Sequence, residues 1–281
     1  MERIVAMSGP EQVRLRAADG IVLVADYYER VTGGGPAGTV AEAPAYLLGH
    51  GFTGSSRRPH VQAIARRLQQ RGATVLVLNF RGHGPSQGRS SIGVSEVADV
   101  AAGLQWLRAR RPDAPLVSLG FSMGASIVVR HAGLQADPDA GPGGELAASP
   151  DAVVAVSGPG RWYERGTQPM RRLHLAVETR LGRQVLRRMF NTRVVDRWEL
   201  LPVSPVEVAS AITAPLLVVH GDQDDYFPLA HPRMLAAAAP RSCLWIEAGM
   251  GHGEHATSVE LVDRIDAWAR SELGASATMD R

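Results

Sequence analysis

Short apolar runs alternate with helical patterns along most of this chain, and that alternation restricts its fold more than any other feature. The longer segments between the runs carry apolar residues at three- and four-residue steps, at 61–71, 94–110, 123–132, 231–239 and 258–271. Strands separated by helices of this length pair in parallel through right-handed crossovers. Two earlier alternating runs, 13–16 and 21–29, flank the turn signal Ala18-Asp19-Gly20 and predict a hairpin. We therefore predict an α/β fold with a mostly parallel, doubly wound sheet of about eight strands and an N-terminal hairpin.

Length and composition narrow the class of protein further. A chain of 281 residues can bury one large core, and no apolar run approaches the length needed to cross a membrane. The first ten residues lack the apolar core of a signal peptide. The single cysteine, Cys243, rules out an internal disulfide, so no oxidising compartment is required. We expect a cytoplasmic protein without a membrane span.

The chain contains no lysine, and all 30 of its basic residues are arginine. This excludes a Schiff-base lysine, a phosphate-loop lysine and a serine–lysine dyad. His252, Glu254 and His255 lie close together in the sequence, but they do not have the H-E-x-x-H spacing of a zinc site. The sequence therefore predicts an activity that uses neither a cofactor nor a metal.

The segment Gly120-Phe121-Ser122-Met123-Gly124 has the G-x-S-x-G pattern of a nucleophile elbow. An apolar run with strand character, 115–119, precedes it, and a segment that can begin a helix, 125–131, follows it. The glycines let strand and helix approach closely, and the tight turn makes the serine hydroxyl project from the edge of the sheet. The position between strand and helix makes the motif much more specific than the pentapeptide alone.

Four further apolar runs lead into polar, glycine-containing loops, which are 50–54, 79–86, 220–225 and 249–253. With the elbow, this set resembles the α/β-hydrolase superfamily over about residues 13–269. The resemblance implies a catalytic serine, acid and histidine in that chain order, which these loops can supply. It also implies an esterase- or lipase-like serine hydrolase with a small helical cap between the sixth and seventh strands.

The resemblance assigns the three catalytic roles to Ser122, His252 and Asp224. A serine hydroxyl needs a base within hydrogen-bond reach, and His252 follows the last strand in a glycine-rich loop. His255 is the alternative base. The family pattern H-G-x-x-D falls on His220 to Asp224, which favours Asp224 as the acid and leaves Asp225 as the alternative.

Two backbone amides are expected to stabilise the oxyanion, as developing negative charge requires donors that are already in place. The resemblance assigns them to Met123, which follows the nucleophile, and to Phe52, which follows His50-Gly51. His50 and His83 are expected to support their loops rather than to take part in the chemistry.

Residues 161–209 interrupt the alternation and are expected to form the cap, between core segments 1–160 and 210–281. Apolar positions there recur as on one face of a helix. Arginines outnumber acidic residues by ten to three between 161 and 197. They favour either a solvated helix face or a lid that attracts an anionic or carrier-linked acyl substrate.

The basic residues lack interleaved aromatics, so we expect no nucleic-acid partner. Candidate substrate-binding residues are Trp162, Tyr163, Arg165, Met170 and Met189.

The sequence thus predicts a serine hydrolase that cleaves a carboxylic ester or a thioester through an acyl-enzyme. An acyltransferase, a carbon–carbon bond hydrolase and a cofactor-free perhydrolase or haloperoxidase can use the same residues and stay open. A non-catalytic binding protein with this fold is a further alternative from a different class. The motifs do not predict the physiological substrate or the oligomeric state.

Overall fold

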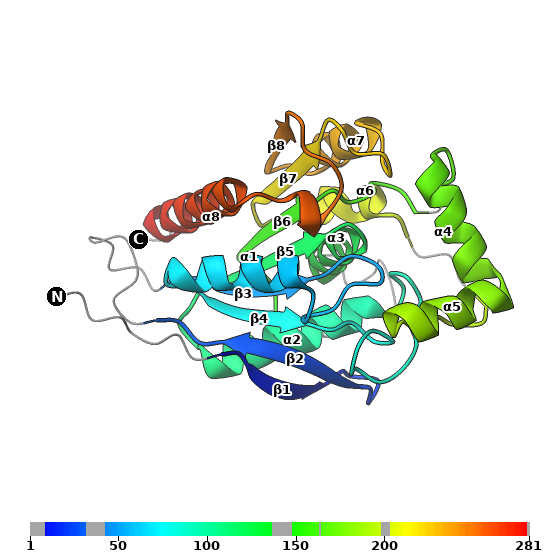
Figure 1. Cartoon of the computed structure of the whole chain (residues 1–281). Helices are drawn as coiled ribbons and strands as arrows, with labels where there is room; N and C mark the ends of the chain where they lie inside the picture. The colour runs from blue at the N-terminus through cyan, green and yellow to red at the C-terminus, as the bar shows by residue number, and fades with distance from the viewer. Residues whose placement is uncertain (1–8, 32–42, 137–147, 163, 198–202, 280–281) are drawn as a thin grey trace.

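The computed structural model describes residues 9–31, 43–136, 148–162, 164–197 and 203–279, with side chains as far as residue 275. Its centre is an eight-stranded sheet in the order β1-β2-β4-β3-β5-β6-β7-β8 (Figure 1). β1 pairs antiparallel with β2, β2 pairs antiparallel with β4, and all the later pairs are parallel. The strands are β1 (Glu11–Arg16), β2 (Val22–Tyr28), β3 (Ala45–Gly49), β4 (Thr74–Leu78), β5 (Leu116–Phe121), β6 (Ala152–Val156), β7 (Leu216–Gly221) and β8 (Ser242–Glu247). The predicted mostly parallel sheet and its hairpin are confirmed.

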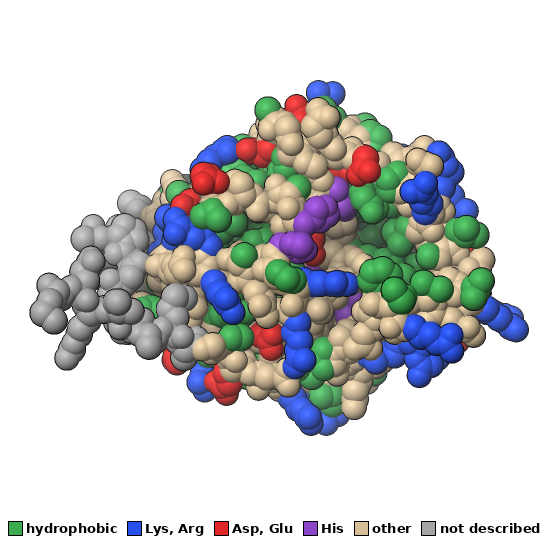
Figure 2. Space-filling view, in the orientation of Figure 1, with side chains coloured by type: hydrophobic (Ala, Val, Ile, Leu, Met, Phe, Trp, Pro, Cys, Tyr) green, Lys and Arg blue, Asp and Glu red, His purple; other side chains and the backbone are tan. Residues whose placement is uncertain are grey.

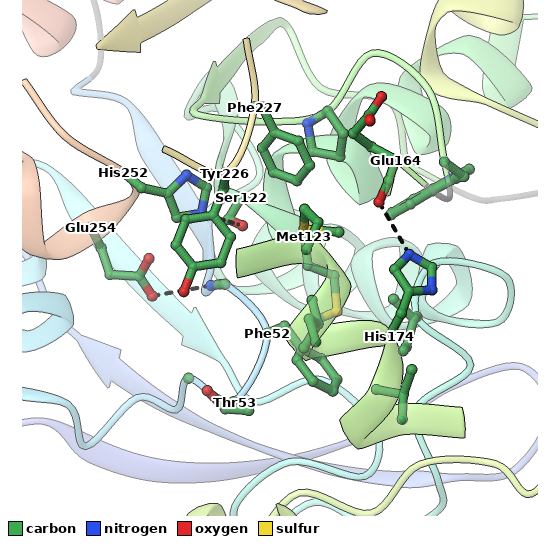
Figure 3. A pocket seen from close by; sticks show the side chains of 18 of the residues that line it. Phe52, Thr53, Ser122, Met123, Glu164, His174, Tyr226, Phe227, His252 and Glu254 are labelled. Atoms are coloured by element: carbon green, nitrogen blue, oxygen red, sulfur yellow. Dashed lines mark hydrogen bonds between the residues drawn. The ribbon is translucent and has the colours of Figure 1, made fainter. Parts of the chain in front are cut away.

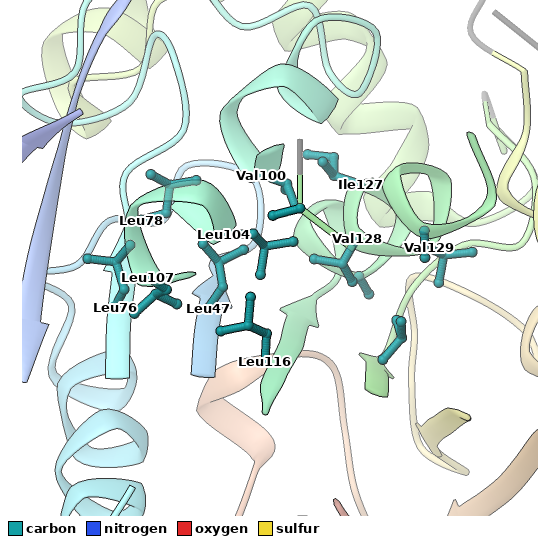
Figure 4. Close-up of a cluster of buried hydrophobic side chains, with 14 of the residues drawn as sticks. Leu47, Leu76, Leu78, Val100, Leu104, Leu107, Leu116, Ile127, Val128 and Val129 are labelled. Carbon is teal, nitrogen blue, oxygen red and sulfur yellow. The ribbon is translucent and has the colours of Figure 1, made fainter. Parts of the chain in front are cut away.

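Helices cover both faces of the sheet, because the inner strands present apolar side chains alternately to either side. Leu47 of β3 belongs to one buried cluster and its neighbour Leu48 to the other. Figure 4 shows the first cluster, in which the sheet packs against two helices through Leu104 and Val128. These helices are α2 (Glu96–Arg110) and α3 (Met123–Ala136), and α7 (Ala230–Ala238) packs on the same face. The opposite face is covered by α1 (Pro59–Gln70) and α8 (Val259–Met279).

Two helices, α4 (Gln168–Glu178) and α5 (Arg180–Phe190), lie between β6 and β7 in the chain and stand at one end of the sheet (Figure 1). A single turn, α6 (Pro205–Val208), follows them before β7. Thr179 separates α4 from α5 with an extended backbone, and its side chain accepts a hydrogen bond from the Gly182 amide as the N-cap of α5. The apolar positions expected on one helix face therefore belong to two helices of different direction.

No helix among the described residues is both long enough and apolar enough to span a bilayer. The crossovers place the carboxyl ends of the parallel strands at one edge of the sheet, where α/β folds bind their ligands. The loops after β3, β5, β7 and β8 meet at this edge, beside α4.

Candidate active site

Ser122 occupies the turn between β5 and α3 with a positive φ of 50°, a strained angle for a residue other than glycine. The flanking glycines make the turn possible. A Cβ on Gly120 would lie 2.3 Å from the Gly124 carbonyl oxygen, and a Cβ on Gly124 would lie 2.5 Å from that of Gly49. Close contact between β3, β5 and α3 thus fixes the serine at the edge of the sheet.

His252 connects Ser122 to Asp224 through both of its ring nitrogens. Figure 3 shows His252 and Ser122 beside each other at the pocket. The Nε2 of His252 lies 2.9 Å from the Ser122 Oγ, and its Nδ1 lies 2.8 Å from the Asp224 Oδ2. The structure thereby brings together three residues that the sequence analysis singled out from loops after β5, β7 and β8. With Nδ1–H donating to the carboxylate, Nε2 is free to accept the serine proton.

The loop after β7 holds the Asp224 carboxylate in place. Its Oδ1 accepts hydrogen bonds from the amides of Tyr226, at 2.8 Å, and Phe227, at 3.0 Å. Burial raises the pKa of Asp224, but the His252 hydrogen bond, the charge of that imidazole and the Phe227 amide outweigh burial and lower the pKa overall. A carboxylate that stays ionised can stabilise an imidazolium beside it.

The alternative acid and base lie elsewhere. Asp225 is exposed, and exposed Asp222 accepts the Gly249 amide at 2.7 Å, a structural role in the turn. His255 is also exposed, and its ring centre lies 5.9 Å from that of His60. Within the described part of the chain, neither Asp225 nor His255 forms a hydrogen bond with Ser122 or His252, so the geometry favours Asp224 and His252.

The two amides expected to bind an oxyanion, those of Phe52 and Met123, belong to residues that line the same pocket as Ser122. Met123 is the first residue of α3, so its N–H has no acceptor within its own helix. The peptide that carries the Phe52 N–H is held through its carbonyl, the Gly51 oxygen. That oxygen lies 2.8 Å from His50 Nδ1 and accepts the Gly54 amide at 2.9 Å.

His50 and His83 form a buried pair behind this loop, with ring centres 5.0 Å apart. Burial, reinforced by the charge of His83, lowers the pKa of His50 to about 3, and burial lowers the pKa of His83 to about 4. A neutral His50 can donate from Nδ1 to the Gly51 oxygen while its Nε2 accepts the Phe80 amide at 3.4 Å. The contacts of His50 and His83 agree with the supporting function expected for them.

The sequence analysis missed two residues that contact the site. The Glu254 carboxylate lines the pocket and accepts a hydrogen bond from the Gly51 amide at 3.1 Å, in the loop after β3 that carries the Phe52 amide (Figure 3). Tyr226 stacks on His252, with ring centres 4.2 Å apart and an angle of 23° between the planes. Their positions, two residues after Asp224 and His252 in the chain, were the only available signal.

A pocket of about 600 Å³ opens above Ser122, between the sheet edge and α4. Its inner wall is apolar, because Phe52, Ile92, Met170, Leu173 and Val177 contribute to it. Six charged side chains also line it, three arginines and three glutamates: Arg58, Arg161, Arg165, Glu164, Glu178 and Glu254.

Of the residues expected to bind substrate, Trp162, Arg165 and Met170 line this pocket. Tyr163 lies outside the described residues. Met189 is not among the lining residues, and 73% of its side chain is exposed, because α5 turns away from the direction of α4 at Thr179.

Comparisons with known proteins agree with the architecture. A profile of the family described as alpha/beta hydrolase fold matches residues 44–139. The chain is 29% identical to a monoacylglycerol lipase of Mycolicibacterium smegmatis, over 81% of this chain and 88% of the lipase. An uncharacterized protein of Rickettsia prowazekii is 38% identical over 36% of this chain, and the match spans 44% of that protein's length.

Solved structures resemble the fold over nearly the whole chain. An esterase of Pyrococcus furiosus superposes with a TM-score of 0.68 at 19% identity, covering 93% of this chain and 92% of the esterase. A Butyrivibrio proteoclasticus protein with bound ferulic acid gives a TM-score of 0.62, also at 19% identity, over 93% of this chain and all of that one. The chain thus has the fold of these structures, and the profile match over residues 44–139 supports the α/β-hydrolase superfamily that its motifs predicted.

Proposed function

We propose that this protein is a serine hydrolase that cleaves carboxylic esters through an acyl-enzyme on Ser122. The observation that carries the proposal is the hydrogen-bonded chain Ser122–His252–Asp224, which ends at the apolar pocket. A serine becomes nucleophilic when a base can take its proton, and the base needs a third group to orient it. The esterase and lipase names among the similar proteins support the same reaction class.

The geometry supports a two-step reaction. In the first, the Ser122 Oγ attacks the acyl carbon while His252 Nε2 takes its proton, and the Phe52 and Met123 amides stabilise the oxyanion. Collapse of this intermediate breaks the bond to the leaving alcohol, which departs with the proton from His252. In the second step, water loses a proton to His252 as it attacks the acyl carbon. The bond to the Ser122 Oγ then breaks, His252 returns the proton to that oxygen, and the carboxylic acid is released.

The pocket favours an uncharged acyl group as substrate. Many of its lining side chains are apolar, and glutamates are as numerous among the rest as arginines. Arg165 is also paired with Glu178, so its charge is partly compensated. We therefore propose a neutral aliphatic or aromatic acyl ester rather than the anionic, carrier-linked one that the arginine count had suggested, with a thioester as the closest alternative. Residues 161–209, with α4 over the pocket, are proposed as the cap.

The molecule that accepts the acyl group from Ser122 distinguishes a hydrolase, which uses water, from the alternative activities. An acyltransferase would pass the acyl group of Ser122 to an alcohol, and one similar yeast protein is named as a medium-chain fatty acid ethyl ester synthase/esterase. The yield of ester and of free acid in water containing added ethanol would measure this partition. A dominant ethyl ester product would replace the hydrolase with a transferase, and peroxide-dependent halogenation would indicate the perhydrolase.

Labelling by a fluorophosphonate, followed by intact-protein mass, tests the proposal. We expect one label on the wild-type protein and none on Ser122→Ala or His252→Ala. His255→Ala is the matched control, since it removes a pocket-lining but exposed histidine and should leave labelling unchanged. Absence of labelling in a folded wild-type protein, or equal labelling of Ser122→Ala, would contradict the proposal.

A further inference from the structure

The pair α4–α5 exposes more large apolar side chains than any other part of the described structure. Of the eight that are exposed, five lie on this pair, namely Leu175, Leu181, Val185, Met189 and Phe190. Figure 2 shows apolar side chains gathered on the side of the molecule where Figure 1 places these helices, beside a hollow with histidines at its edge. Contiguous exposed apolar surface of this kind usually marks an interaction site.

Three of these side chains form a stripe along α5. Leu181, Val185 and Met189 follow one another at four-residue steps and therefore share one face of the helix. Their exposed fractions are 73%, 47% and 73%. The buried residue of α5 is Leu186, which packs with Val177 and Val194 on a different face. The helix is thus anchored to the protein through Leu186 while the stripe stays uncovered.

Arginines surround the stripe. α4 and α5 together carry six arginines and one acidic residue, Glu178. Five of the arginines form no salt bridge within the described part of the chain, namely Arg171, Arg172, Arg180, Arg187 and Arg188. These arginines lie outside the substrate pocket, which is lined by equal numbers of arginines and glutamates.

A second cavity, of about 710 Å³, lies against α5 and collects this charge. Five arginines line it, beside Glu178, Gln184 and Asp196: Arg89, Arg180, Arg183, Arg187 and Arg197. Asp196 forms salt bridges with Arg89 and Arg183, so three of the five remain without an ionic partner in the described structure. Burial, and then repulsion from Arg187 and Arg89, lowers the pKa of nearby Arg193. Guanidinium groups crowded in this way are suited to phosphate oxygens, which they bind through paired hydrogen bonds.

We propose that α5 docks on an anionic lipid surface. The stripe of Leu181, Val185 and Met189 enters the boundary of the acyl chains, and the arginine-lined cavity takes the headgroup phosphates. A helix with an apolar face and an arginine-rich polar face lies in such an interface. A second copy of this chain is disfavoured as the partner, because it would bring six more arginines against the same surface.

Docking would bring the substrate pocket to the lipid surface, because α4 lines that pocket through Met170, Leu173 and Val177. Docking of α5 follows from the exposure and charge of its side chains alone and does not depend on the chemistry of Ser122. A binding experiment therefore tests it separately from the proposed hydrolase activity.

The test is co-sedimentation of the full chain with two kinds of vesicle, phosphatidylcholine alone and phosphatidylcholine with phosphatidylglycerol. We expect binding to the anionic vesicles and at least about tenfold weaker binding to the neutral ones, since each arginine near an anionic surface contributes on the order of 1 kcal/mol. Added inorganic phosphate should compete only weakly, because it does not occupy the stripe.

Two variants separate the two parts of the surface. Replacing Leu181, Val185 and Met189 together by serine removes the stripe, and replacing Arg180, Arg187 and Arg188 by glutamine removes charge. Each should weaken binding to anionic vesicles at least about tenfold and leave the hydrolysis of a short, water-soluble ester unchanged. The matched control replaces three exposed arginines on other elements, Arg14, Arg66 and Arg233, by glutamine.

Three results would overturn the proposal. They are equal binding to both kinds of vesicle, an equal loss of binding in the control variant, and no binding to anionic vesicles at all. Sedimentation equilibrium gives a further check. A dimer of the wild type that dissociates when the stripe is replaced would show that a second copy covers it, contrary to our inference.

Discussion

His131 should make the protein sensitive to acid. Its ring is fully buried in α3, and neither ring nitrogen has a hydrogen-bond partner among the described residues. Burial lowers the pKa of His131 to about 3, from 6.5. As the pH falls below 6.5, the unfolded chain binds a proton at His131 that the folded chain does not bind. The free energy of unfolding therefore decreases as the pH is lowered.

The size of this effect follows from the two pKa values. Each pH unit between them contributes about 1.4 kcal/mol to the difference in free energy of unfolding. From about pH 7.5 to about pH 4.5, His131 alone should cost the native state about 3 kcal/mol. His50 and His83 have lowered pKa values for the same reason and add to the total acid sensitivity.

Replacing His131 by leucine separates its contribution to the acid-induced loss of stability from those of His50 and His83. Because no hydrogen bond is lost, His131→Leu should be at least as stable as the wild type near neutral pH. Its loss of stability on acidification should be smaller by about 3 kcal/mol. Urea unfolding followed by tryptophan fluorescence at the two pH values gives both quantities, with His60→Leu, at an exposed site, as the control. A variant with unchanged pH dependence, or one destabilised by several kcal/mol at neutral pH, would refute the reasoning.

Three further predictions concern activity. Asp224→Asn should lower kcat by about 10³–10⁴-fold, because the ionised partner of His252 is lost, whereas Asp225→Asn should change it little; steady-state kinetics on a soluble ester compares the two. Glu254→Gln should lower kcat by about tenfold with little change in KM, since its carboxylate holds the Gly51 amide; an equal kcat would limit Glu254 to a surface role. Leu173→Trp should fill the apolar end of the pocket and shorten the acyl chain accepted; unchanged hydrolysis of long-chain esters would place their acyl group elsewhere.

The sequence could predict the sheet because its signals are local. A hydrophobic strand followed by a glycine-containing loop is recognisable wherever it occurs, and parallel pairing then places the loops at one edge. This is why Ser122, Asp224 and His252 could be proposed before their distances were known. His131 had no such signal, because an isolated histidine in an apolar helix looks the same whether its ring is hydrogen-bonded or not.

The cap was harder to predict because its pattern depends on where a helix ends. Apolar positions from Leu173 to Met189 fit one continuous helix, but Thr179 adopts an extended backbone and divides them. Leu173 and Val177 then line the pocket, while Met189 is exposed on α5. Glu254 was missed for a related reason, since its contact with Gly51 joins residues about 200 positions apart.

The position of β8 at the edge of the sheet has a consequence for how this protein would lose activity. β8 pairs with β7 alone and is half-exposed along most of its length, yet the loop that follows it carries His252. An edge strand can detach while the inner strands remain paired, because local opening costs less than global unfolding. Loss of activity on heating or in denaturant should therefore precede unfolding of the sheet. The catalytic rate would then measure how much of the protein still has β8 paired with β7.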